Sequence, residues 1–96
     1  MIEIKKQQNQ LLLSGELSRK TINNSFEKKV SRLLTKEIEL VDLSAVSNVD
    51  TAGLASLLLM LEQTIKRSHT IHFTNIPQEL LNLAKLSAVD KFLPIK

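Results

Sequence analysis

The chain has 96 residues, of which 43% are hydrophobic and 24% are charged, and its formal net charge is +3. This length is typical of one domain, and the 18 leucines suffice to fill one core. The absence of cysteine excludes disulfide bonds, thiolate metal sites and cysteine catalysis. Three phenylalanines without Trp or Tyr leave few rings for stacking on bases, and so small a charge does not indicate a polyanionic partner. We therefore expect a single domain over residues 1–96 that does not bind nucleic acid.

Neither the N-terminal segment nor the most apolar run of the chain indicates export or a membrane span. Residues 1–10 (MIEIKKQQNQ) carry charges where a signal peptide requires an apolar segment. The most apolar run, residues 54–61 (LASLLLML), is far shorter than the ~20 residues that cross a bilayer. We expect a soluble cytoplasmic protein with no direct membrane insertion.

The first half of the chain predicts a hairpin, a helix and a covered strand. Residues 2–7 alternate between apolar and polar side chains and predict a strand, and residues 10–14 predict a second one. A turn near Asn9 joins the two, which favours antiparallel pairing. Residues 21–35 have apolar side chains at helical spacing. Residues 38–43 form a short, mostly apolar run that is typical of a covered strand.

The second half predicts another helix, strand and helix. A polar loop follows Leu43, and the next helix spans residues 51–67, where cations at its end favour the helix dipole. Residues 70–74 predict a strand, and a third helix extends from Pro77 to about Ser87. The order is β-β-α-β-α-β-α, and its two strand–helix–strand units imply parallel strands with right-handed crossovers. The expected fold is α/β, with a small mixed sheet and helices packed on it.

The start of the second helix is the most informative place for a site. Its first amides, at Ala52, Gly53 and Leu54, have no acceptor within the helix and can hold a phosphate or another anion, with the Thr51 hydroxyl beside them. A structural explanation is available for the same residues. Either Asp50 or Thr51 can act as the helix N-cap, and Gly53 can allow close packing of the helix on the sheet. From the residues alone, the structural explanation is favoured.

Two helices carry more apolar residues than one inward stripe requires. In the second helix the expected inward stripe consists of Leu54, Leu57 or Leu58, Leu61 and Ile65. Apolar side chains are left on other arcs, namely Leu59, Met60, Ala52 and Ala55. The third helix repeats this excess with Leu80, Leu81, Leu83, Ala84 and Leu86. A helix that is apolar most of the way round buries its second face in the core or in a partner, so we expect a protein-binding surface.

Catalytic and metal-binding patterns are missing from the sequence. His69 and His72 have no third ligand nearby, so we expect them to be solvated side chains at a strand edge. The G-x-x-x-x-G-K phosphate loop is absent, and no nucleophile–base pair is visible. We therefore expect no metal, no cofactor and no enzymatic activity.

Two motifs stand out, residues 11–17 (LLLSGEL) and residues 41–54 (VDLSAVSNVDTAGL), where Asp42-Leu43-Ser44 precedes the Asp-Thr-x-Gly-Leu opening of a helix. They closely resemble the STAS family, which includes bacterial anti-sigma factor antagonists and the cytoplasmic domains of sulfate transporters. The resemblance covers nearly the whole chain and implies the STAS fold. It also implies that Thr51 occupies the position that a partner kinase phosphorylates in anti-sigma factor antagonists. Those proteins usually continue G-E-L with Asp, whereas this chain has Ser18.

Residues 50–67 (DTAGLASLLLMLEQTIKR) and residues 75–94 (NIPQELLNLAKLSAVDKFLP) show a closer resemblance within the family. They are similar to the small STAS subunits of Mla phospholipid-transport ABC complexes. This resemblance implies a non-catalytic subunit that binds the cytoplasmic ATPase, within a complex with a membrane permease, and so lies peripheral to the inner membrane. Such a transporter maintains the lipid asymmetry of the outer membrane. The alternative is an anti-sigma factor antagonist that is switched by phosphorylation of Thr51.

Either function predicts the same contact surface. The residues expected to bind the partner, or to form a phosphorylation-like site, are Asp50, Thr51, Ala52, Gly53, Leu54, Ala55, Leu58 and Leu59.

Overall fold

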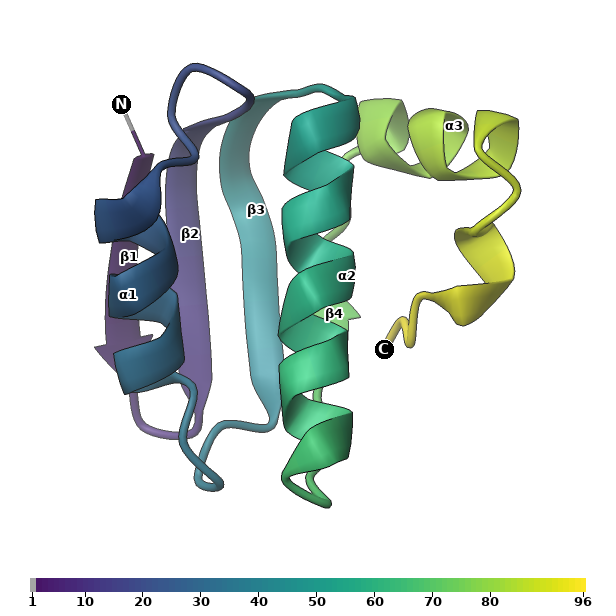
Figure 1. The fold of residues 1–96 in the computed structure, drawn as a ribbon. Coiled ribbons are helices and arrows are strands. Elements are labelled where there is room, and N and C mark those ends of the chain that lie inside the picture. Colours follow the sequence, from purple (N-terminus) through teal and green to yellow (C-terminus); the bar gives the residue numbers. More distant parts are fainter. Residues whose placement is uncertain (1) are drawn as a thin grey trace.

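The computed structural model describes residues 2–96 as a four-stranded sheet with two helices against one face and a third beyond its edge (Figure 1). In chain order the elements are β1 (Ile2–Gln7), β2 (Gln10–Leu17), α1 (Asn24–Leu33), β3 (Leu40–Val49), α2 (Thr51–Lys66), β4 (His72–Thr74), α3 (Gln78–Leu86) and the 3-10 turn η1 (Asp90–Phe92). The predicted β-β-α-β-α-β-α order and the mixed α/β class are confirmed.

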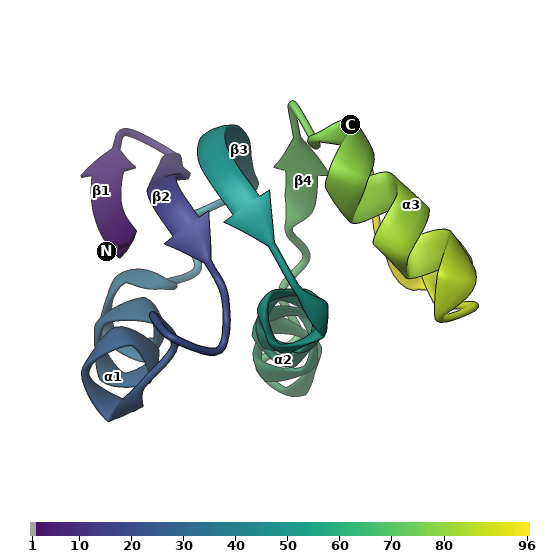
Figure 2. The same cartoon turned by 90° about the horizontal axis from the view of Figure 1, so that it is seen from above.

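The strands follow the order β1-β2-β3-β4 across the sheet. β1 is antiparallel to β2, while the pairs β2–β3 and β3–β4 are parallel. Figure 2 shows α1 and α2 on the same face of the sheet, α1 over β1 and β2 and α2 over β3 and β4. α3 lies beyond the β4 edge, and the opposite face of the sheet carries no helix in the part of the chain that the structure describes. None of the helices in residues 2–96 combines the length and the apolar character that crossing a membrane requires.

The hairpin forms as predicted, around a turn at Gln8 and Asn9. Gln8 adopts a left-handed backbone conformation, with φ of 54°, which closes the tight connection between β1 and β2. β2 then runs three residues further than expected, to Leu17. Its last residue is fully buried, and this carries the strand up to the start of α2.

The polar loop expected after Leu43 is wrong, because β3 continues to Val49. Ala45 and Val46 pair with β2, as does Val49 at the strand end, and the register shifts twice along this pair of strands. The buried residues Leu43, Val46 and Val49 are therefore three apart, instead of alternating. A spacing of three does not match the period of two that identifies a half-buried strand in a sequence, which is why the extension was not predicted.

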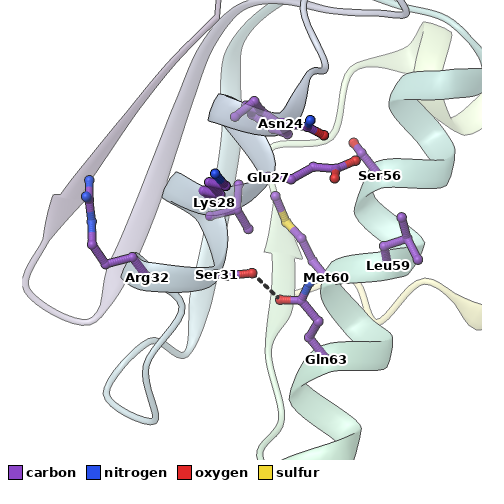
Figure 3. A pocket seen from close by; sticks show the side chains of 11 residues that line it. Asn24, Glu27, Lys28, Ser31, Arg32, Ser56, Leu59, Met60 and Gln63 are labelled. Atoms are coloured by element: carbon purple, nitrogen blue, oxygen red, sulfur yellow. Dashed lines mark hydrogen bonds between the residues drawn. The ribbon is translucent and has the colours of Figure 1, made fainter.

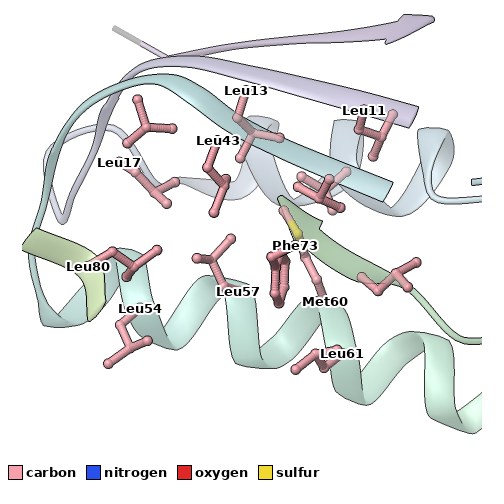
Figure 4. Packing of buried hydrophobic residues seen from close by; sticks show 14 of the residues in the cluster. Leu11, Leu13, Leu17, Leu43, Leu54, Leu57, Met60, Leu61, Phe73 and Leu80 are labelled. Atoms are coloured by element: carbon pink, nitrogen blue, oxygen red, sulfur yellow. The ribbon is translucent and has the colours of Figure 1, made fainter. Parts of the chain in front are cut away.

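The core lies between the sheet and α2. Figure 4 shows leucines of the strands, among them Leu13 and Leu43, facing Leu57 and Met60 of the helix. Met60, expected on an outer arc, is 2% exposed, whereas Ile65, expected in the inward stripe, is 71% exposed. The inward stripe uses residue 64 in place of residue 65.

Thr64 fits the core because its hydroxyl donates a hydrogen bond to the Leu61 carbonyl at 2.9 Å and needs no further donor or acceptor.

Two of the helices begin later than predicted, whereas α2 begins at Thr51 as expected. α1 starts at Asn24 because the Asn23 side chain accepts a hydrogen bond from the Phe26 amide at 2.9 Å, and residues 18–22 form a turn in which Thr21 and Ile22 both donate to the Ser18 carbonyl. α3 starts at Gln78, with Pro77 as its N-cap rather than its first helical residue.

Candidate functional site

Asp50 is the N-cap of α2 and joins that helix to the turn before α1. One carboxylate oxygen, Oδ1, accepts a hydrogen bond from the Gly53 amide at 2.9 Å, and Oδ2 accepts one from the Arg19 amide at 3.0 Å. The Arg19 and Gly53 N–H groups hold the pKa of Asp50 below its usual range, against a smaller effect of burial. Asp50 is therefore the cap, and the alternative that Thr51 fills this role is excluded.

Gly53 allows α2 to touch the end of β2. A Cβ atom at this position would lie 2.1 Å from the Leu17 carbonyl oxygen and 3.1 Å from Leu17 Cγ. Both clashes involve the last residue of a paired strand, whose backbone has little freedom to move. The Asp50 amide points to the same carbonyl oxygen at 3.4 Å. The structural explanation of Gly53, close packing of helix on sheet, is confirmed.

Thr51 stands at the exposed corner beside these contacts. It is the first residue of α2, its side chain is exposed, and within residues 2–96 its hydroxyl makes no hydrogen bond. The helix N-terminus favours a negative group at this place, whereas the neighbouring Asp50 carboxylate opposes one. The Thr51 hydroxyl is thus free to contact a partner or to be modified.

Three of the eight predicted site residues lie on one exposed line of α2. Thr51, Ala55 and Leu59 are each one turn apart, and all three are exposed, Leu59 by 49%. We call these three residues the α2 ridge. Ala52 and Leu58 are half-buried.

The other predicted residues do not reach the surface together with the ridge. Leu54 is 3% exposed and belongs to the core, and Gly53 is buried against Leu17. Asp50 is half-buried, and both its carboxylate oxygens are engaged. These three residues fix the position of the ridge and offer little surface for contact.

The Asp42-Leu43-Ser44 motif ties β3 to the residue that follows β4. Asp42 Oδ1 accepts hydrogen bonds from the Ser44 amide at 2.8 Å and from Asn75 Nδ2 at 3.2 Å. Burial raises the pKa of Asp42, but the hydrogen bonds from Ser44 and Asn75 outweigh it and leave the pKa lowered. The hydrogen bonds of Asp42 to Ser44 and Asn75 give the motif a structural role, which is to hold the residue after β4 against β3.

A groove between α1 and α2 was not predicted. It has a volume of about 620 Å³, and Phe26, Val30 and Met60 line it with apolar surface. Figure 3 shows Ser31 and Gln63 bridging the two helices, where the Ser31 hydroxyl donates to Gln63 Oε1 at 3.3 Å. Leu59 belongs both to the ridge and to the lining, so the two surfaces are continuous. The groove could not be predicted because it depends on the distance between α1 and α2, which are separated in the chain by β3, and no pattern of consecutive residues encodes that distance.

The prediction that both histidines are solvated side chains at a strand edge is wrong for His69. The His69 ring is half-buried, and its Nε2 donates to the Ile38 carbonyl at 2.6 Å, so this residue is not a solvated side chain. His72 is half-buried in β4. Within residues 2–96 no group of three or more His, Asp or Glu residues is placed to hold a metal ion.

A mixed four-stranded sheet with two helices on one face, and an Asp-capped helix after β3, agree with the STAS fold. The sequence model of the family described as "Mlab, STAS domain" matches residues 1–94, and the chain belongs to this family.

Two relatives bear the same name, intermembrane phospholipid transport system binding protein MlaB. The protein from Escherichia coli (strain K12) is 36% identical over 76 residues, which are 79% of this chain and 76% of that protein. The protein from Haemophilus influenzae is 31% identical over 87 residues, which are 86% of this chain and 83% of that protein.

A solved structure with the same fold is that of the anti-sigma factor antagonist SpoIIAA in its unphosphorylated form. The TM-score is 0.65, the match covers 99% of this chain and 86% of that chain, and the sequence identity is 13%. At this identity the likeness concerns the fold.

Proposed function

We propose that this protein is a non-catalytic STAS subunit of an ABC-type intermembrane phospholipid transport system, and that it binds the cytoplasmic ATPase subunit of that system. In this role it supports assembly and activity of the transporter, which maintains the lipid asymmetry of the outer membrane. The protein would lie at the cytoplasmic side of the inner membrane through its partner. The relatives named MlaB, a binding protein of such a system, support the proposal.

The observation that carries the proposal is the α2 ridge. It presents a free hydroxyl at Thr51, a small side chain at Ala55 and a large apolar one at Leu59, on a helix whose first turn is held rigidly by Asp50. A small residue next to a half-exposed leucine gives a partner a flat contact with an apolar centre. Such a centre, surrounded by polar groups, is typical of a protein–protein interface.

The test is Thr51→Glu, which places a carboxylate on the ridge. The affinity for the purified ATPase subunit should fall at least about tenfold, because the new charge must be desolvated in the interface. The fold should survive, since a negative charge at a helix N-terminus is tolerated. Thr51→Ser, which keeps the hydroxyl, and Gln7→Glu, which adds the same charge on exposed β1, are the controls and should bind like the wild type. Unchanged binding of a folded Thr51→Glu variant would refute the placement of the interface.

An anti-sigma factor antagonist is the second candidate, favoured by the exposed and unbonded hydroxyl of Thr51. The residue at position 18 opposes it, because Ser18 supplies a buried hydroxyl, which donates to the Glu16 carboxylate, where anti-sigma factor antagonists usually have Asp. Intact-mass measurement after incubation with an anti-sigma kinase from the same genome decides between the two. Gain of one phosphate that is lost in Thr51→Ala would favour this second candidate.

A further inference from the structure

The α1–α2 groove has the properties of a docking site for a short segment of protein. Its base is closed by Phe26, Val30 and Met60, which are almost fully buried, and the apolar side chain that it exposes is Leu59, which is 49% exposed and forms one wall. Lining residues on α1 extend from Asn24 to Arg32, roughly 12 Å along the helix axis or about two turns. The Ser31–Gln63 hydrogen bond crosses between the helices, and the groove lies beside the α2 ridge.

The segment that contains α1 is strongly positive, and two of its cations, Lys28 and Arg32, are among the residues that line the groove. Residues 18–36 contain a single acidic residue, Glu27, and six cations, which are Arg19, Lys20, Lys28, Lys29, Arg32 and Lys36. All six cations are exposed, and none of them forms an ion pair within residues 2–96, where the two salt bridges are Lys6–Glu37 and Lys66–Glu62. This segment therefore attracts an acidic surface, although the whole chain carries a net charge of only +3.

Glu27 places a negative charge inside the groove, beside the cations of α1. Figure 3 shows its carboxylate reaching from α1 towards Ser56, whereas Arg32 points away on the far side of α1. An acidic residue of a partner is repelled near Glu27 inside the groove and attracted to Lys28 at the outer rim. The charges therefore favour a partner whose acidic side chains lie at the outer rim.

From these observations we infer that the groove binds an acidic amphipathic helix of the protein partner, with apolar side chains against Leu59 and Asp or Glu against Lys28. An amphipathic helix suits this arrangement because it presents apolar and acidic side chains three or four residues apart, next to one another on one face of a single segment. The inference rests on the proposed function, since it takes the ATPase subunit as the partner that covers the adjoining α2 ridge.

A pair of adjacent lysines allows a matched test. Lys28 lines the groove, whereas Lys29, the next residue on the same helix, does not. Lys28→Glu should weaken binding to the purified ATPase subunit about fivefold or more, and Lys29→Glu, with the same change in charge, less than about twofold. Equal losses in the two variants would show a general effect of net charge and overturn the groove as the site. An unaffected Lys28→Glu variant would do so as well.

Photo-crosslinking identifies the occupant. p-Benzoylphenylalanine at Asn24, an exposed residue that lines the groove, should capture an ATPase peptide with acidic residues next to apolar ones at helical spacing. The same probe at Ser25, which is exposed but outside the groove, should not. A crosslink from Asn24 to a second copy of this chain, or to a segment without acidic residues, would overturn the inference.

The two proposals fail in different ways. If the wild-type chain does not bind the ATPase, both fall. If Thr51→Glu abolishes binding while Lys28→Glu and the Asn24 probe have no effect, the proposed function stands and only the groove inference is wrong.

Discussion

Replacing Gly53 with Ala should destabilise the protein, although Ala is the better helix former. The propensity difference in a helix interior favours Ala by about 1 kcal/mol. Against this, the new Cβ would lie 2.1 Å from the Leu17 carbonyl oxygen, more than 1 Å inside ordinary contact. The end of β2 or the start of α2 must then move, and overpacking of this kind costs about 3 kcal/mol.

The two opposing effects leave a net destabilisation of about 2 kcal/mol. For a chain of this length that corresponds to a melting temperature about 8–16 °C lower. In urea the midpoint of unfolding should fall by about 1 M, with an unchanged slope. Circular dichroism at 222 nm follows both transitions, because α2 is the longest helix and its loss dominates the signal.

Ala55→Gly serves as the control for helix propensity. Ala55 is exposed on the same helix, so its replacement should cost about 1 kcal/mol without any change in packing. If Gly53→Ala were as stable as the wild type, or more stable, the contact between α2 and Leu17 would not limit this position. The same contact positions the α2 ridge, so the account of the site would then also need revision.

Two further variants test the cap and the core. Because hydrogen bonds lower the pKa of Asp50 from its ordinary value of 3.8, the ionised carboxylate contributes its full stabilisation above that pH and loses it as the pH falls through the lowered pKa. The gap in unfolding free energy between the wild type and Asp50→Asn, from urea titrations, should therefore narrow in acid; a gap independent of pH would contradict this. Leu57→Ala, at a fully buried position, should cost about 2–5 kcal/mol, and Leu59→Ala less than about 1 kcal/mol. Similar costs by thermal unfolding would mean that Leu59 is not half-exposed.

The parts of the fold that follow local periodicity could be predicted from the sequence. The hairpin, three helices and the element order depend on alternation and on helical spacing, which are properties of consecutive residues. The extension of β3 to Val49 could not be predicted, because it depends on shifts in the pairing with β2. The exchange of Ile65 for Thr64 and Met60 in the core depends on how α2 is rotated against the sheet, and near-uniform apolar character of the helix conceals that rotation.

The sequence was sufficient to locate the candidate site along the chain, but not to tell which of its residues form the exposed surface. The sequence places Asp50, Thr51 and Gly53 at a helix start, yet it does not tell which of them face solvent. That distinction depends on the backbone of Arg19 and Leu17, because main-chain amides and carbonyls are the same in every residue type and leave no signature. The groove between α1 and α2 is likewise a property of two helices brought together by the sheet.

The double hydrogen bond of Asp50 has a thermodynamic consequence for binding. One carboxylate holds the amide of Arg19 and that of Gly53, so the turn before α1 and the first turn of α2 cannot loosen separately. The surface that contains Thr51 is then already ordered in the free protein, and association requires little further loss of conformational entropy there. Order of this kind in the free protein raises the affinity for a partner, and differences in affinity among related complexes lie mostly in the rate of dissociation.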